Sequence, residues 1–109
     1  MINFTEIQIK TLVKAMRPPV EYRDELDIGY QFEKNSLEIF EIRPQWNNRK
    51  NILHLPFAKA RYIKNKEIWK LYWMRGNGKW ESYQPNPDVT SIDEVFQIID
   101  EDEYHCFKG

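Results

Sequence analysis

The chain has 109 residues, 41% of them hydrophobic and 15% aromatic, and this length and composition fit one domain with a single packed core. Its 16 basic residues nearly balance 17 acidic ones, and a net charge of -1 excludes a molecule whose overall charge attracts nucleic acid or anionic membranes, so any such attraction must be local. The single cysteine excludes an intramolecular disulfide, and because there is no signal-peptide pattern and no apolar run of about 18 residues, we expect a cytoplasmic protein with no membrane segment.

The first expected elements are a helix and two strands. Apolar residues recur at helical spacing at Ile9, Leu12, Val13 and Met16. This pattern predicts an amphipathic helix over residues 4–16, which Pro18-Pro19 cannot continue. Alternating apolar and polar residues then predict a strand over residues 26–34, and a turn at Lys34-Asn35-Ser36 leads into a second strand over residues 37–43. The second strand has apolar residues at both odd and even positions, so alternation does not fix which of them face the core, and the register of this hairpin stays open.

The middle of the chain predicts a loop followed by an aromatic β-hairpin. Residues 43–51 are polar and indicate an exposed loop, and Pro56 separates a short apolar piece from two strands over residues 57–64 and 67–75. A two-residue turn at Asn65-Lys66 pairs small residues with large ones on one face. These pairs are Ala58 with Trp73, Ala60 with Leu71, and Tyr62 with Trp69. The small-against-large matching identifies this face as the core face.

The opposite face of the same hairpin is basic and aromatic. It receives Lys59, Arg61, Ile63, Ile68, Lys70, Tyr72 and Met74. Asn77-Gly78 is typical of a two-residue type I′ turn, which predicts a further strand over residues 79–84. With that turn, Trp80 and Ser82 join the core face, while Glu81 and Tyr83 join the basic face.

The last expected element is a helix over residues 91–101. Ser91 stands three residues before Glu94, which is the spacing of a capping box. An apolar stripe follows at Ile92, Val95, Phe96 and Ile99. The whole pattern predicts a single α+β domain, with a mostly antiparallel sheet of about five strands flanked by an amino-terminal and a carboxy-terminal helix. The order of the strands stays open.

Several runs of the chain together resemble the bacterial domain of unknown function called DUF3024. They are residues 38–44 (EIFEIRP), residues 64–75 with IWKLYWMR, Lys79-Trp80, and the ending at residues 100–104 with Cys106-Phe107 and Gly109. The resemblance extends over nearly the whole chain from Pro18 and implies a one-domain bacterial protein, but it carries no activity. The family usually has glycine at the position of His105, which counts against a shared catalytic role for this residue.

Charge is distributed unevenly along the chain. Residues 56–84 hold seven basic and two acidic residues, whereas residues 88–104 hold seven acidic residues and no basic one. The two segments either neutralise each other as neighbours in the fold, or the basic face meets a polyanion. Whether the acidic segment packs on the basic strands stays open.

The function that we favour from these patterns is a small non-enzymatic binding module, with nucleic acid as its ligand class and no cofactor. The candidate residues are Lys59, Arg61, Lys70, Tyr72 and Tyr83. Cations of this kind neutralise phosphates, and the flat rings offer stacking surfaces for bases.

Two alternatives remain open. Ile63, Ile68 and Met74 lie on the same face and favour a homodimer or a protein partner. A small metal-dependent enzyme would use carboxylates at Asp100, Asp102 and Glu103, because hard cations bind oxygen ligands, although no EF-hand spacing accompanies them. His54, His105 and Cys106 supply the only imidazoles and thiol, and their spacing predicts no catalytic residue.

Overall fold

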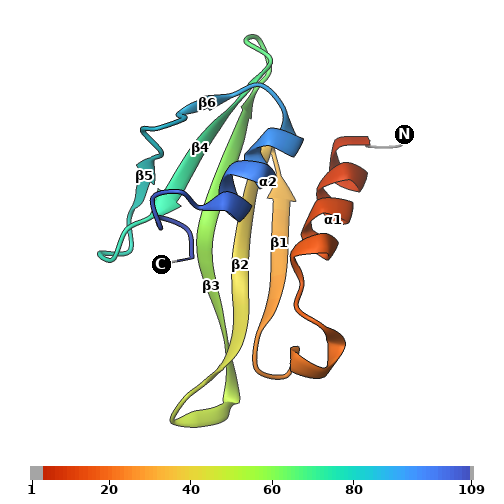
Figure 1. The fold of residues 1–109 in the computed structure, drawn as a ribbon, viewed down its shortest axis with the longest axis vertical. Coiled ribbons are helices and arrows are strands. Elements are labelled where there is room, and N and C mark those ends of the chain that lie inside the picture. The colour runs from red at the N-terminus through yellow and green to blue at the C-terminus, as the bar shows by residue number, and fades with distance from the viewer. Residues whose placement is uncertain (1–3, 109) are drawn as a thin grey trace.

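The computed structural model describes residues 4–108 as one antiparallel sheet with two helices on the same face (Figure 1). The helices are α1 (Phe4–Met16) and α2 (Ile92–Glu101), and a short 3-10 helix, η1, spans Val20–Tyr22. The strands are β1 (Asp27–Glu33), β2 (Ser36–Gln45), β3 (Asn48–Ile63), β4 (Ile68–Met74), β5 (Trp80–Ser82) and β6 (Asp88–Val89). They follow the order β1-β2-β3-β4-β5, and β6 also pairs with β4. The predicted α+β class is confirmed.

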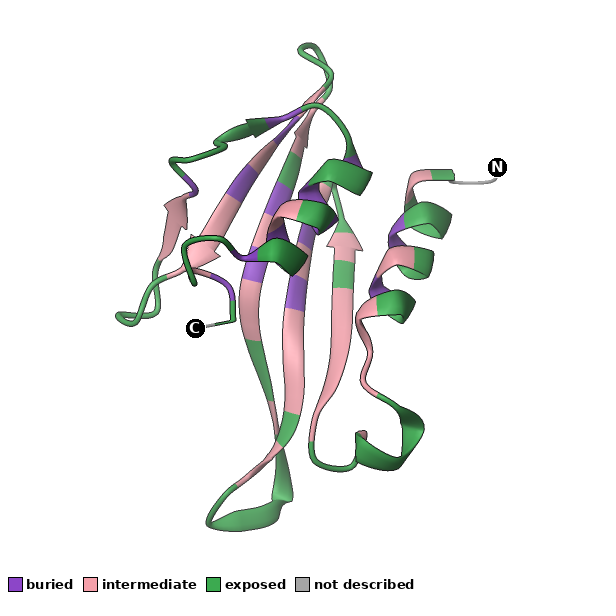
Figure 2. Ribbon diagram, viewed as in Figure 1, coloured by how far each residue is buried: buried purple, intermediate pink, exposed green. Residues whose placement is uncertain are grey.

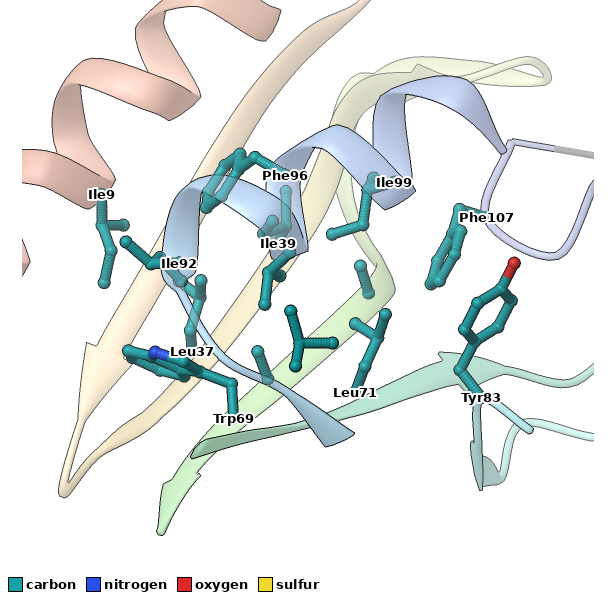
Figure 3. Packing of buried hydrophobic residues seen from close by; sticks show 14 of the residues in the cluster. Ile9, Leu37, Ile39, Trp69, Leu71, Tyr83, Ile92, Phe96, Ile99 and Phe107 are labelled. Atoms are coloured by element: carbon teal, nitrogen blue, oxygen red, sulfur yellow. The ribbon is translucent and has the colours of Figure 1, made fainter. Parts of the chain in front are cut away.

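The two helices bury the stripes that their sequences predict. In α1, Ile9 and Val13 are buried against the sheet. In α2, the Ser91 side chain accepts a hydrogen bond of 3.2 Å from the Glu94 backbone N–H, which satisfies one of the unpaired donors at the start of the helix. The apolar residues of both helices and of the facing strands form one continuous core (Figures 2 and 3).

A tight two-residue turn at Lys34-Asn35 sets the register between β1 and β2. Both residues have positive φ, 51° and 64°, as a type I′ turn requires, and Glu33 pairs with Ser36. Ser36 therefore begins β2 instead of completing the turn. This register buries Leu37, so the residues of β2 that alternate with it face away from the helices.

The predicted loop over residues 43–51 is wrong. β2 continues to Gln45 and β3 begins at Asn48, so the two strands form a long arm whose turn exposes 87% of the Trp46 surface. A polar sequence can form paired strands as well as a loop, because the backbone hydrogen bonds between two solvent-exposed strands need no apolar face. Pro56 does not end the strand either: the pairing shifts between Ala58 and Pro56, and this irregularity accommodates a residue with no N–H to donate.

The predicted register of the central hairpin is the observed one. Ala58 pairs with Trp73, Ala60 with Leu71, and Tyr62 with Trp69. The turn is longer than two residues: residues 64–67 form it, and Glu67 has a φ of 52°. Because both turn lengths preserve the same pairing, the small alanines lie in the core as expected.

The predicted turn between β4 and β5 is wrong, and the error changes which side chains face the core. The Gly78 N–H donates to the Arg75 carbonyl and the Arg75 N–H donates to the Lys79 carbonyl, both at 2.9 Å, so three residues form the loop. Only Gly78, with a φ of 80°, has the left-handed conformation. The extra loop residue pairs Met74 with Trp80, and a one-residue shift moves every β5 side chain to the other face.

An ion pair fixes the junction between α1 and β1. The Arg17 guanidinium donates through Nε and Nη2 to the two carboxylate oxygens of Asp27, both at 2.8 Å. These hydrogen bonds lower the pKa of the Asp27 carboxyl from its ordinary value. The pair therefore ties the helix to the edge strand through two parallel charged hydrogen bonds.

We expect the Asp27→Asn variant to be less stable than the wild type at neutral pH. A lowered pKa stabilises the folded state above the unfolded value of about 4, and this contribution is lost as pH falls through the folded pKa. The difference in urea midpoint between the two proteins should therefore shrink steadily below about pH 4 and vanish at the most acidic end. Glu25→Gln, which removes an exposed pair with Arg49, is the control and should change little. A difference that persists in acid would contradict the ionic origin of the effect.

Candidate functional site

The face of the sheet opposite α1 and α2 carries no helix in residues 4–108 (Figure 1). The part of this side that lies on β3, β4 and β5 carries cations, aromatic rings and apolar side chains. We call this part the outer face. Its members are Lys59, Arg61, Ile63, Ile68, Lys70, Tyr72, Met74, Trp80 and Ser82. The pairing places Lys59 beside Tyr72 and Arg61 beside Lys70.

Lys59, on β3, lies beside two aromatic rings of this surface. Its Nζ is 5.7 Å from the centre of the Tyr72 ring and 5.9 Å from the centre of the Trp80 ring. Glu38 on β2 is its neighbour in the ladder, yet no ion pair joins the two in the described part of the chain. The ammonium group is instead held by the electron-rich faces of two rings on adjacent strands.

The other two predicted cations differ from each other. Arg61 is exposed, and its side chain has no hydrogen bond or ion pair within residues 4–108. Lys70 forms an ion pair. Its Nζ lies 2.9 Å from a carboxylate oxygen of Asp88, and this contact raises the pKa of Lys70. Asp88 is on β6, so the acidic segment does pack on the basic strands at this point. Arg61 is therefore free to bind an anion, whereas Lys70 is partly neutralised.

The prediction that places Tyr83 on this face is wrong. Only 2% of its surface is exposed, and its ring packs 5.0 Å from that of Phe107 in the core (Figure 3). Burial raises the pKa of the Tyr83 phenol. Trp80 takes its place on the outer face, because the three-residue loop shifts β5 by one position. The signal for this shift is Gly78, whose left-handed φ suits the last position of a three-residue loop as well as the second position of a two-residue turn.

The carboxylates of the acidic ending do not gather around one point. The Asp102 carboxylate accepts hydrogen bonds from the backbone N–H groups of Phe107 and Lys108, at 3.0 and 2.8 Å. Asp100 pairs with the Lys108 ammonium at 3.4 Å, and Glu103 is exposed. Within residues 4–108, no three His, Cys, Asp or Glu side chains are grouped so that they could hold a metal ion. Asp102 has a structural role, since it fastens the end of the chain.

No hydrogen bond joins His54, His105 and Cys106 to one another within residues 4–108. The His54 ring stacks on that of Phe40, with centres 5.0 Å apart. Cys106 packs against the core, and desolvation raises the pKa of its thiol, which disfavours the nucleophilic thiolate. These groups therefore form no activated nucleophile in the described part of the chain.

The outer side of the sheet is electrically divided. The register places Glu33 and Glu38 on the same side as Lys59 and Arg61, but on the neighbouring strands β1 and β2. An anion is thus attracted to β3–β5 and repelled from β1–β2.

No helix in residues 4–108 has the length and apolar character needed to cross a bilayer.

The model of one protein family matches nearly the whole chain. This model, DUF3024, is described as a domain of unknown function and covers residues 2–109. No curated protein matches the chain, and no solved structure matches it. The match identifies a family without supplying an activity.

Proposed function

Because the chain belongs to the DUF3024 family, whose function is unknown, we propose its function from the outer face: the protein is a small non-enzymatic module that binds single-stranded nucleic acid. The observation that carries the proposal is the position of Lys59 beside the rings of Tyr72 and Trp80, with the unpaired Arg61 on the same strand. Rings and cations interleaved on an open sheet match what an unpaired strand presents, namely flat bases and charged phosphates.

The two rings are placed to receive successive bases. Tyr72 is opposite Ser82 and Trp80 is opposite Met74, so the rings occupy diagonal positions, about 7 Å apart at the backbone. Stacking on such rings contributes about 1–3 kcal/mol per base and tolerates any base. A duplex hides the faces of its bases, so this surface favours single strands.

The distribution of charge determines where the bound nucleic-acid strand lies on the sheet. Phosphates pair with Lys59 and Arg61, and they are repelled by Glu38, which lies on β2 on the same side of the sheet. The ligand therefore runs along β3–β5.

A cytoplasmic location belongs to the same proposal. Cys106 is a free thiol, and a reducing compartment keeps such a group unpaired.

The test is a titration of tryptophan fluorescence with an oligothymidylate of about 12 nucleotides and with a duplex of equal length. We expect saturable binding of the single strand that weakens steeply between about 50 and 200 mM salt. Combining Lys59→Gln with Arg61→Gln should weaken binding about tenfold and lower the salt slope by about 1.4, because two phosphate contacts are lost. The matched control removes Lys10 and Lys14, exposed on α1, in the same way. Equal loss in the control pair, or no saturable binding by the wild type, would contradict the proposal.

Replacing Glu38 with lysine shows whether nucleic acid or a second copy of the chain binds to this side of the sheet. Glu38→Lys removes a repelling charge beside Lys59, so oligonucleotide affinity should rise by roughly threefold to tenfold at low salt. A dimer through this side of the sheet would set the acidic half of one copy against the basic half of the other, and the same substitution would weaken it. Sedimentation gives the mass of both proteins. A dimer that dissociates on substitution, with no gain in oligonucleotide affinity, would make the second copy the occupant.

A further inference from the structure

A cavity of about 390 Å³ opens on the helix side of the sheet, away from the outer face. It lies where the amino-terminal ends of α1 and α2 meet the β1–β2 turn and the turn between β3 and β4. A volume of this size is at the lower end of the range for small-molecule sites, roughly 300–1,000 Å³, so it fits a ligand of one or two rings.

Three aromatic rings form one wall of the cavity. The centre of the Trp69 ring is 5.1 Å from that of Tyr62 and 6.4 Å from that of Phe32, and both pairs are tilted by more than 40°. The rings come from β1, β3 and β4, and the neighbouring strands hold them in place. Such a wall favours a flat apolar body.

Trp69 also offers an unused hydrogen-bond donor. Its side chain is 5% exposed, and its indole N–H has no acceptor among residues 4–108. Every fully buried side-chain nitrogen or oxygen in residues 4–108 has a hydrogen-bond partner. Because the Trp69 indole N–H has none, it is not fully buried. The cavity is the open space that Trp69 lines, so the N–H is accessible from it. Figure 3 shows Trp69 at the edge of the core cluster, close to Ile92. A ligand with an acceptor on its ring edge would satisfy the donor.

The charge of the cavity is positive. Lys64, in the turn after β3, is the only charged residue among the described ones that line it. The side-chain amides of Gln8 and Asn35 line the same space and supply neutral donors. No carboxylate lines the cavity within residues 4–108, so an anionic group meets attraction and no repulsion at its wall.

We propose that this cavity binds a small planar anion, meaning an aromatic or heteroaromatic ring system that carries one acidic group. The ring packs against Phe32, Tyr62 and Trp69, and the acidic group lies at Lys64. This site is separate from the outer face and does not depend on the function proposed for that surface.

The test uses three probes of equal shape and different charge: 1-naphthoate, 1-naphthamide and 1-naphthylmethylamine. Nuclear magnetic resonance of the nitrogen-15-labelled protein follows the indole N–H signal of Trp69 and the amide of Tyr62. We expect 1-naphthoate to shift both signals saturably and to bind about tenfold more tightly than 1-naphthamide, which corresponds to one charged contact. The cationic amine should bind most weakly.

Two lysines of the same turn provide matched variants. Lys64→Gln should remove the preference for 1-naphthoate over 1-naphthamide and leave the affinity for 1-naphthamide unchanged. Lys66→Gln, at an exposed position that does not line the cavity, should change neither affinity. The proposal is overturned if no probe shifts the Trp69 indole signal, if the anion and the cation bind equally, or if Lys66→Gln has the same effect as Lys64→Gln.

Discussion

The Asp102→Ala variant is expected to lose about 3 kcal/mol of unfolding free energy, because two backbone N–H groups lose their charged acceptor. Asp102 is 7% exposed, and its carboxylate accepts hydrogen bonds from the backbone N–H groups of Phe107 and Lys108, so it holds the end of the described chain over the core. Its φ of 43° is left-handed, and alanine tolerates this conformation poorly. For a domain of this size the loss corresponds to a fall in Tm of about 12 °C, measurable by circular dichroism.

The sign of the change separates this account from the alternative of a solvated acidic run. Asp102 lies in a stretch of four consecutive carboxylates at the carboxyl end of α2, where negative charge opposes the helix dipole. If these groups were merely solvated, removing one would stabilise the protein. Asp102→Asn, which keeps one acceptor and tolerates a left-handed φ, should lose about half as much as the alanine variant. Glu103→Ala, at an exposed neighbour, should stay within about 0.5 kcal/mol of the wild type.

Tyr83→Ala should destabilise the protein by about 3–4 kcal/mol, whereas Trp80→Ala should cost about 1 kcal/mol or less. Trp80 begins β5 and Tyr83 directly follows it, but the three-residue loop sends Tyr83 into the core and leaves Trp80 half-buried on the outer face. Removing the Tyr83 ring leaves a cavity beside Phe107, which the rigid sheet fills poorly. Urea denaturation of both variants gives the comparison.

The same pair of variants tests the register between β4 and β5. The two-residue turn would place Trp80 in the core and Tyr83 on the surface, so it reverses the order of the two losses. A Trp80→Ala variant less stable than Tyr83→Ala would contradict the observed loop.

Local sequence signals predict the helices and the central hairpin because each signal acts through its own neighbours. The Ser91 hydroxyl and the Glu94 backbone N–H are three residues apart, so the start of α2 needs no tertiary information. Alternation of small and large residues likewise fixes the pairing of Ala60 with Leu71, since only that match fills the core evenly.

The β4–β5 loop shows where local signals fail. Asn77-Gly78 suits a two-residue turn, while Gly78 equally suits the left-handed last position of a three-residue loop, and the two turns differ by one position in register. The outcome depends on which aromatic side chain fills the space next to Phe107, and Phe107 is 24 residues after Tyr83 in the sequence. A sequence pattern contains no measure of that space.

The candidate site was predictable to a similar extent. Lys59, Arg61 and Tyr72 share a face because strand alternation places them there, and this requires only the register of one hairpin. The neutralisation of Lys70 by Asp88 depends on the return of the chain as β6. The cavity beside Trp69 is lined from both helices and from two turns, so no single stretch of sequence indicates it.

Mapping of amide signals shows whether single-stranded nucleic acid binds to β3–β5 of the outer face. Oligothymidylate is added to the nitrogen-15-labelled protein at low salt, and the shifts of every amide are followed. We expect saturable shifts centred on Lys59, Arg61, Tyr72 and Trp80, with the indole signal of Trp80 among the largest and the signals of α1 unchanged. Shifts confined to the helix side, or none on β3–β5 at saturating oligonucleotide, would contradict the proposed binding.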